Sequence, residues 1–516
     1  MVPRCMAIGD GVLNSAREAS LCPMSGTVRP PVEARAFHST QGTRCSFPFY
    51  RPGESRMRTL SLPLIVAALL SGCSQTPDPT PTPQDSGVPQ QDSGVPQQDS
   101  GVPPEDSGVP PDDAGTPPDD AGTPPDDAGV PPEEPLPTGP PVPQGPPNVP
   151  EFDPAFPGQT RVPAIQTQTP IQVTEIASGF RNPWAIAFLP DQRMLVTEKP
   201  TGSLYIVTPQ GAKSPAVAGL PPVDGRGQGG LLDVEVGPDY AQSHLIYWTY
   251  SEPRQGGNGL AVARAKLVDG AQPRVEDVQV IFRMMPTLES TLHSGGRMVF
   301  TPDGKLFVTL GERSILAGRV QAQNVNSHFG KVVRINPDGS VPQDNPFVNT
   351  EGAKPEIWSV GHRNVLSAAL DSQHRLWTVE MGPRGGDELN RPEAGKDYGW
   401  PTIGYGEEYS GAPIHESPRG PGMEQPVYYW DPVISPSGMT IYSGTLFPEW
   451  RNNVFIGGLS SQALVRLMMR NDHVVGEEHL LKDLGARIRE VVQGPDGALY
   501  LLTDATNGKL LKVTPR

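Results

Sequence analysis

The hydrophobic pattern of residues 164–516 consists of short apolar runs that recur in pairs. The clearest copies are residues 297–309 and 490–502, in which a Pro-Asp-Gly turn separates two β-rich runs, and residues 185–196 follow the same design. Proline presets φ in such a turn, aspartate bonds to nearby backbone, and glycine accepts positive φ. Short strands joined by these turns predict antiparallel sheets, and long helical periodicity is nearly absent.

The pattern occurs six times, in copies that begin near Asn182, Gly229, Gly295, Asn364, Ser437 and Arg489. A spacing of about 45–75 residues suits one four-stranded blade of a β-propeller per copy. A sandwich or a parallel β-helix would leave this spacing and the long loops unexplained. We therefore predict an all-β fold over residues 164–516, a six-bladed β-propeller with four-stranded antiparallel blades. Residues 166–177 are predicted to pair with the C-terminal strand, which closes the ring and hides the sheet edges.

Residues 73–163 have a different composition, rich in proline and glycine. An aspartate recurs every seven residues, at Asp85, Asp92, Asp99, Asp106, Asp113, Asp120 and Asp127. Such a segment has few apolar side chains whose burial could offset the entropy lost on folding. Because proline favours an extended chain and the aspartates repel one another, we predict a disordered, solvated Pro/Asp-rich linker. Calcium binding by these aspartates is the weaker alternative, since no copy has EF-hand spacing.

Residues 57–72 have the features of a secretory signal peptide. Met57 and Arg58 give a positively charged start, and the apolar run 60–70 is too short to span a bilayer. Residues 70–73 resemble the bacterial lipobox, which implies lipidation of Cys73 after cleavage; an ordinary signal peptide that carries a cysteine is the alternative. Ser74 stands where aspartate would favour the inner membrane. We therefore expect translation to start at Met57, without residues 1–56, and the product to be an exported cell-envelope lipoprotein of the outer membrane.

Charge, cysteine usage and missing motifs exclude several classes of function. A net charge of −16 argues against nucleic-acid binding, which needs clustered cations. The propeller region can hold no disulfide, thiolate metal site or catalytic thiol, because the chain's four cysteines are Cys5, Cys22, Cys45 and Cys73. A P-loop, an HExxH helix, a GxSxG elbow and a GxGxxG strand–helix turn are all missing. Nicotinamide dehydrogenases, NTPases and α/β-hydrolases are thereby disfavoured.

Two segments that precede predicted inner strands carry candidate chemistry. Propeller loops converge on one face of the central channel, so polar residues at these places are candidates for a site. His293 is followed by two glycines that let a ligand approach closely, and it could act as a general base near neutral pH. A structural histidine is the alternative. Arg363 and Asn364 follow His362, and the arginine could stabilise an oxyanion or simply bond loop carbonyls.

Two further segments suggest a cation site and an anion site. Residues 381–390, followed by 398–401, combine carboxylates with glycines, which suits a hard cation such as calcium. A turn-rich loop without metal is the alternative. Arg487 and Arg489 alternate along a predicted strand and should share one face, where two guanidinium groups need an anion. A salt-bridged surface pair would explain them equally well.

Together these segments resemble the soluble PQQ-dependent aldose sugar dehydrogenase family, of the glucose/sorbosone dehydrogenase type. The resemblance covers about residues 170–516 and is most specific over 382–390 and 398–401. It implies an enzyme that uses pyrroloquinoline quinone (PQQ) and calcium to oxidise aldose sugars at C1 to lactones, with an external electron acceptor. His293 would be the catalytic base that takes the proton of the anomeric hydroxyl while hydride passes to PQQ. Gln228 would bind substrate near that centre.

The resemblance also implies which residues hold the cofactor and the metal. The cofactor contacts would be Arg363, Asn364, Tyr409, Gly458, Leu459, Ser460, Arg487, Ile488 and Arg489. Calcium would be bound by Glu388 and the carbonyl of Tyr398, with Gly382 and Pro383 near a second, cofactor-bound calcium. Relatives usually carry a lysine at the position of Ser460, and its loss removes one positive charge from the predicted cofactor site.

Two other functions stay open at this point. A PQQ enzyme of the same fold could act on another alcohol or aldehyde, such as a sorbosone-type substrate. A surface-tethered propeller could also bind glycans or proteins without catalysis, because a fold does not determine a function. The change at Ser460 is the feature of the sequence that favours this last alternative.

Overall fold

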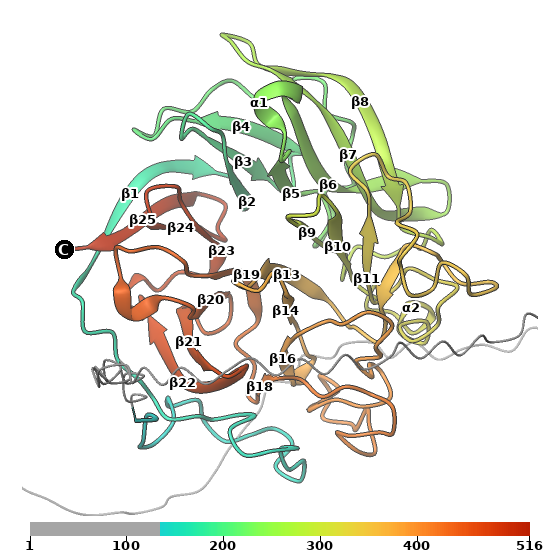
Figure 1. The fold of residues 1–516 in the computed structure, drawn as a ribbon, viewed down its shortest axis with the longest axis vertical. Coiled ribbons are helices and arrows are strands. Elements are labelled where there is room, and N and C mark those ends of the chain that lie inside the picture. Colours follow the sequence, from blue (N-terminus) through green and yellow to red (C-terminus); the bar gives the residue numbers. More distant parts are fainter. Residues whose placement is uncertain (1–134) are drawn as a thin grey trace, which may run out of the picture. The chain divides into compact units, whose positions relative to one another are not determined.

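Six β-sheets arranged as the blades of a ring make up most of the computed structural model, which describes residues 135–516 (Figure 1). The expectations for residues 1–56, the signal peptide, Cys73 and most of the linker lie outside the described residues. Each innermost strand begins at one of the six sequence copies. The predicted all-β, six-bladed β-propeller is therefore confirmed.

The blades are antiparallel sheets that follow one another in chain order. Blade 1 contains β2 (Pro183–Phe188), β3 (Met194–Glu198) and β4 (Ser203–Val207). Blade 2 contains β5 (Leu231–Val236), β6 (Leu245–Arg254), β7 (Gly257–Val268) and β8 (Arg274–Arg283). Blade 3 contains β9 (Gly295–Phe300), β10 (Leu306–Leu310), β11 (Lys331–Ile335) and β12 (Ile357–Ser359).

The second half of the ring repeats this arrangement. Blade 4 contains β13 (Val365–Leu370), β14 (Leu376–Glu380), β16 (Asp387–Asn390) and β18 (Tyr428–Trp430). Blade 5 contains β19 (Pro436–Ile441), β20 (Val454–Gly458), β21 (Leu464–Arg470) and β22 (His473–Leu480). Blade 6 contains β23 (Ile488–Gln493), β24 (Leu499–Thr503), β25 (Gly508–Pro515) and β1 (Ile171–Phe180).

The ring is closed by β1, which pairs antiparallel with the C-terminal strand β25. Their register runs from Ile171 opposite Pro515 to Phe180 opposite Gly508. This confirms the predicted closure, although the strand begins after Pro170 rather than at residue 166. The pairing joins the N-terminal strand of the propeller to its last blade, and each blade keeps an outer edge strand.

Blade 1 is the irregular member, with three regular strands. The place of a fourth strand is taken by residues 213–217, where the amide of Ser214 bonds Ile206 O at 2.9 Å and the amide of Val217 bonds Leu204 O at 2.8 Å. Pro215 lies between them and has no N–H to donate, so the hydrogen-bond ladder cannot be continuous.

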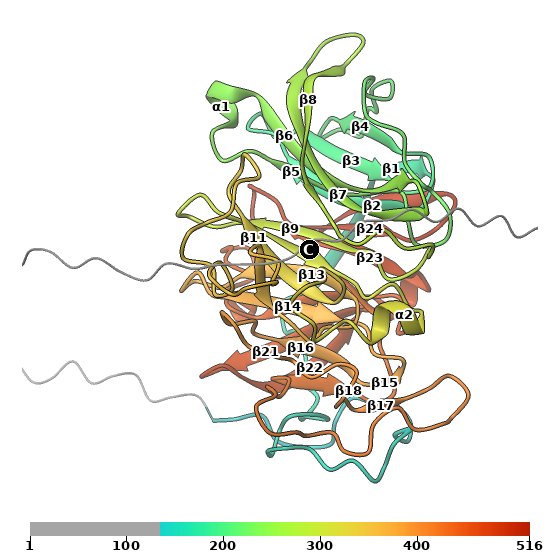
Figure 2. The ribbon, with the colours of Figure 1, turned by 90° about the vertical axis from the view of Figure 1, so that its right-hand side faces the viewer.

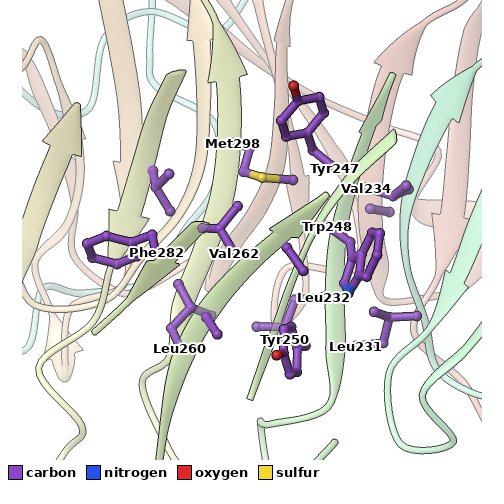
Figure 3. Close-up of a cluster of buried hydrophobic side chains, with 14 of the residues drawn as sticks. Leu231, Leu232, Val234, Tyr247, Trp248, Tyr250, Leu260, Val262, Phe282 and Met298 are labelled. Atoms are coloured by element: carbon purple, nitrogen blue, oxygen red, sulfur yellow. The ribbon is translucent and has the colours of Figure 1, made fainter. Parts of the chain in front are cut away.

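Apolar side chains fill the space between adjacent blades. Figure 3 shows such a cluster, in which Trp248 of β6, Leu260 of β7 and Met298 of β9 are fully buried. Alternation along a strand directs successive side chains to the two faces of its blade, so every blade contributes to two interfaces. Full burial of each large side chain stabilises the fold by about 1.5–3 kcal/mol.

A buried ionic network crosses the central channel and links several blades. Arg297 of β9 bonds Asp233 of β5 at 2.9 Å and also Glu490 of β23. Its guanidinium group lies 4.7 Å from the ring of Trp184 of β2. Gly438 of β19 leaves room for Glu490, since a Cβ there would lie 2.4 Å from that carboxylate. Arg297 therefore holds the inner strands of distant blades to one another.

Residues 140–165 form an arm that packs on blades 4 and 5, which corrects the predicted linker boundary at residue 163. The amides of Asn148 and Val149 bond the Asp431 carboxylate at 2.8 and 2.9 Å, and Ile165 N bonds Glu477 O at 2.9 Å. Val162 is buried in the core cluster of these blades. The aspartate repeat ends before residues 140–165. The apolar residues and backbone hydrogen bonds of this arm supply the contacts that the repeat lacks. The arm runs beside β18 and β22 in Figure 1.

The two faces of the ring carry different additions. Figure 2 shows α2 (Leu316–Arg319) and the ribbon of β15 (Arg384–Gly385) and β17 (Gly406–Glu407) on one side, and α1 (Tyr240–Ser243) on the other. Short 3-10 turns occur at Pro448–Trp450 and Lys482–Leu484. Within residues 135–516, no helix is long and apolar enough to cross a membrane.

Candidate active site

Segments far apart in the sequence meet at the face that carries α2. The loops that lead into β5, β9, β13 and β23 end there, because inner strands of successive blades start at the same end of the channel. A cavity of about 330 Å³ lies among them. Four predicted residues line it, namely Gln228, Leu459, Arg487 and Arg489. The loop of His293 also lines this cavity, through Ser294 and Gly295.

His293 is held by a contact of its side chain and by a hydrogen bond of its backbone amide. Its Nδ1 lies 3.0 Å from Glu312 Oε1, and both side chains are buried. Its backbone amide donates to Gln228 Oε1 at 2.8 Å. If Nδ1 carries the proton toward the carboxylate, Nε2 is left as a proton acceptor.

The electrostatic surroundings keep the imidazole neutral. Burial and the nearby charge of Arg363 lower the pKa of His293 below its ordinary value, and the Glu312 carboxylate opposes this shift only in part. A neutral imidazole at neutral pH is the form that can accept a proton.

The backbone around this pair is strained. His293, Arg313 and Ser314 have φ of 43°, 75° and 59°, in the left-handed region that such residues rarely adopt. Buried Arg313 holds the strained loop through a bond to Ser294 Oγ at 2.9 Å and further bonds to Asn258 and Ser290. Strain that the surroundings maintain is typical of functional sites.

Arg363 and Asn364 are buried and have unused hydrogen-bonding groups. Arg363 Nη1 donates to the carbonyls of Met381 and Gly382 at 2.7 and 2.6 Å, while its Nε has no partner. Asn364 Oδ1 accepts from Gly295 N at 3.2 Å, and its Nδ2 has none. Buried donors without partners are costly, so these atoms indicate a ligand or ordered water.

Arg487 and Arg489 share one wall of the cavity, as their alternation predicts. Both donate to Asp504 Oδ2 at 3.0 Å. Burial alone would raise the pKa of Asp504, but Arg489, the hydrogen bond from Asn182 and Arg487 together outweigh it and bring the pKa to about 2. Arg489 also bonds Ser437 Oγ at 3.1 Å, and its Nε has no partner. Ile488 points the other way, into the core, and does not line the cavity.

The predicted metal residues line a second, much smaller cavity of about 20 Å³. Glu388, Tyr398, Gly382 and Pro383 all lie around it, and Met381 lines both cavities. Within the described part of the chain, Glu388 pairs with no Lys or Arg and bonds only Asn390, at 2.9 Å. Burial, and then Glu380, raise the pKa of Glu388 well above its usual value. An unpaired carboxylate beside backbone carbonyls suits a cation.

The Glucose / Sorbosone dehydrogenase family model matches residues 180–512 of the chain. The chain belongs to this family. The aldose sugar dehydrogenase YliI of Escherichia coli is 43% identical over 352 residues, which cover 67% of this chain and 93% of that protein. A crystal structure of the apo soluble aldose sugar dehydrogenase of Escherichia coli has a TM-score of 0.64 at 42% identity and covers 67% of this chain and 100% of that one.

A second solved structure is the PQQ-bound form of an aldose sugar dehydrogenase from Streptomyces coelicolor. It has a TM-score of 0.54 at 27% identity and covers 67% of this chain and 100% of that one. The resemblance seen in the sequence is thus confirmed at the level of the family.

Of the nine predicted cofactor contacts, Leu459, Arg487 and Arg489 line the cavity of about 330 Å³, whereas Arg363 lines the smaller cavity and Asn364 lines neither. Tyr409 is 72% exposed and lines neither cavity, because its loop projects beyond β17. Ser460 is exposed, and its hydroxyl bonds Val433 O at 3.2 Å. Gly458 ends β20 and supports the turn through the bond of its amide to Ala463 O at 2.9 Å, so only Leu459 of the predicted turn reaches the cavity.

Three residues of the site were missed in the sequence. Glu312 pairs with His293, Asp504 joins the two arginines, and Lys199 lines the same cavity. A lone acidic or basic residue at the end of a strand carries no signal by itself. Only the place of these three at the ends of β10, β24 and β3, on the face where the candidate loops meet, could have identified them.

A larger cavity of about 470 Å³ lies between blades 3 and 4, lined by Trp358, Arg375 and Arg391 among others. It includes none of the predicted site residues. Its arginines are engaged by Asp371, Asp472 and Glu393. The candidate chemistry is therefore at the channel mouth.

Proposed function

We propose that the protein is a PQQ- and calcium-dependent dehydrogenase that oxidises aldose sugars at C1 to lactones. The observation that carries the proposal is the buried His293–Glu312 pair, whose histidine directly precedes Ser294 and Gly295 in the wall of the cavity that Arg487 and Arg489 also line. A base, an anion site and enough room for a ligand lie together there. The names of the family and of its relatives favour a sugar as substrate and PQQ as cofactor.

The residues around the cavity of about 330 Å³ suit PQQ, which carries several carboxylates. Arg487 and Arg489 would hold carboxylates, and the Nε of Arg489, which has no partner, offers a further donor. Arg363 would place positive charge beside the quinone. When bound, PQQ supplies the acceptor for the hydride that leaves C1 of the sugar.

His293 would accept the proton of the anomeric hydroxyl at Nε2. Glu312 orients the ring through Nδ1 and stabilises the imidazolium that forms. Gln228 fixes the backbone of the base and lines the cavity where substrate would enter. Loss of the hydroxyl proton and of the C1 hydride together leave a carbonyl at C1, which is the lactone of the ring form.

Calcium would be held at the smaller cavity by the carboxylate of Glu388 and the carbonyl of Tyr398. The side chain of Tyr398 is unavailable, because its hydroxyl donates to Arg391 O at 2.6 Å. Gly382 and Pro383 lie beside the same cavity, although Gly382 O already accepts from Arg363. A cation there would neutralise the unpaired carboxylate and order the loop next to Arg363.

The decisive experiment adds PQQ, then Ca²⁺, then an aldose and a dye acceptor to the purified apoprotein. We expect dye reduction only when both PQQ and Ca²⁺ are present, and loss of the activity on chelation. Glu388→Gln should raise the calcium concentration needed, whereas Glu424→Gln should not, because half-buried Glu424 lines neither candidate cavity and pairs with exposed Lys396. No dye reduction with any aldose, together with no PQQ binding, would leave a propeller that only binds its partners.

We also propose that a lipid on Cys73 anchors the protein to the outer membrane, with residues 74–134 as spacer. The support is the lipobox-like sequence before Cys73. Labelling cells with an alkyne fatty acid should mark the parent protein and not Cys73→Ser. Equal labelling of both would contradict the anchor, and peptides from residues 1–56 in the precursor would contradict a start at Met57.

A further inference from the structure

We infer that Lys199 is a third cation of the cofactor cavity and binds a carboxylate of the cofactor; the inference rests on the proposed function. Lys199 follows β3 of blade 1 and lines the same cavity as Arg487 and Arg489 of blade 6. No feature of the sequence identifies it, since it occurs in an ordinary turn between two strands.

The backbone of Lys199 is fixed against the loop that carries Gln228. Its carbonyl accepts from Leu231 N at 3.0 Å, and its amide donates to Asn182 O at 3.3 Å. Gly230 permits this contact, because a Cβ there would lie 1.9 Å from Lys199 O. The side chain then reaches along the loop, and Nζ donates to Gly227 O at 3.1 Å. The ammonium group is thus held next to Gln228.

Lys199 has no carboxylate partner within residues 135–516, unlike its two neighbours. Arg487 and Arg489 share Asp504, so the wall carries three cations against one nearby anion. Burial, and then the charge of Arg489, lower the pKa of Lys199. A carboxylate bound between these groups would relieve the repulsion among them. The excess of positive charge matches a ligand with more than one carboxylate.

The alternative is that Lys199 only caps the carbonyl of Gly227. That role predicts a small loss of stability and no change in cofactor affinity. The two readings are separated by measuring binding directly, through equilibrium dialysis of PQQ against apoprotein, with thermal unfolding followed on the same samples.

We expect Lys199→Met to weaken PQQ binding about five- to thirty-fold, the range of one charge-assisted hydrogen bond at a half-buried site. Lys199→Arg should retain most of the affinity. Lys213→Met is the matched control: Lys213 belongs to the same blade but lies over the rings of Phe180 and Tyr205, and its loss should leave PQQ affinity unchanged. A lysine introduced by Ser460→Lys, on the turn that follows Leu459, should recover part of the affinity lost in Lys199→Met.

The trimethyl ester of PQQ tests the carboxylate directly. The parent protein should bind the ester weakly, and Lys199→Met should bind it no more weakly than the parent does. The role of Lys199 would be overturned, and the proposed function left standing, by either of two results. One is equal PQQ affinity of the parent and Lys199→Met; the other is a loss of affinity for the ester in Lys199→Met as large as the loss for PQQ. Failure of the parent to bind PQQ at all would overturn the proposed function as well.

Discussion

Replacing His293 with alanine is expected to lower kcat for aldose oxidation by about 10²–10⁴-fold, the usual contribution of a positioned general base. Binding of PQQ should persist, because the proposed carboxylate contacts come from Arg487 and Arg489 on another blade. The parent protein should also lose kcat/KM as the pH falls through the pKa of His293, which burial and Arg363 place below the ordinary value. This acid limb should be absent from the variant.

His328→Ala is the matched control for that experiment. His328 is likewise buried and pairs with a glutamate, Glu356, at 3.3 Å, but neither His328 nor the residue on either side of it lines a candidate cavity, whereas His293 directly precedes two lining residues, Ser294 and Gly295. Its replacement should cost stability and leave the pH profile unchanged. If His293→Ala turned over sugar at the parent rate, another group would have to be the base.

Replacing Arg297 with methionine is expected to lower the free energy of unfolding by about 3–5 kcal/mol at pH 8. The substitution leaves the buried carboxylates of Asp233 and Glu490 without their cation. Burial already raises the pKa of both, that of Glu490 to about 7, and the loss of Arg297 should raise them further.

The pH dependence of the loss follows from the sign of these shifts. A carboxylate whose pKa is higher in the folded state favours folding only while it is protonated. The destabilisation should therefore be smallest near pH 5 and grow as the pH rises through the folded-state pKa values. Denaturant titrations at pH 5 and pH 8 measure it. Arg274→Met removes an exposed pair with Glu276 and should cost at most about 1 kcal/mol at either pH; an Arg297→Met protein that matched it would show that the channel network contributes little.

The repeated turns made the ring predictable, because the two innermost strands of a blade form a hairpin whose turn type depends on a few consecutive residues. The inner strands begin where the copies of the pattern begin, and alternation alone places Arg487 and Arg489 on one face. Alternation equally directs the side chain of Ile488 into the core, so only the two arginines of residues 487–489 line the cavity.

Partners across the ring could not be predicted in this way. Asn148 of the arm bonds Asp431 beside blade 4, 283 positions away, and no periodic pattern connects a proline-rich segment to this single aspartate. The exposure of Tyr409 depends on how its loop leaves β17, which the surrounding residues do not specify. Lys199 follows a strand of the first blade and Asp504 a strand of the last, so their place at one cavity depends on closure of the ring and has no signal in the local sequence.

The attachment of residues 140–165 has a mechanical consequence. A pull applied from the N-terminal side meets the bonds of Asn148, Val149 and Ile165 to blades 4 and 5 before it can reach β1. The seam between β1 and β25, where an opening ring would start to separate, is thereby shielded from load. Force applied at the N-terminal end of residues 140–165 would therefore detach this short surface segment first and leave the blades joined.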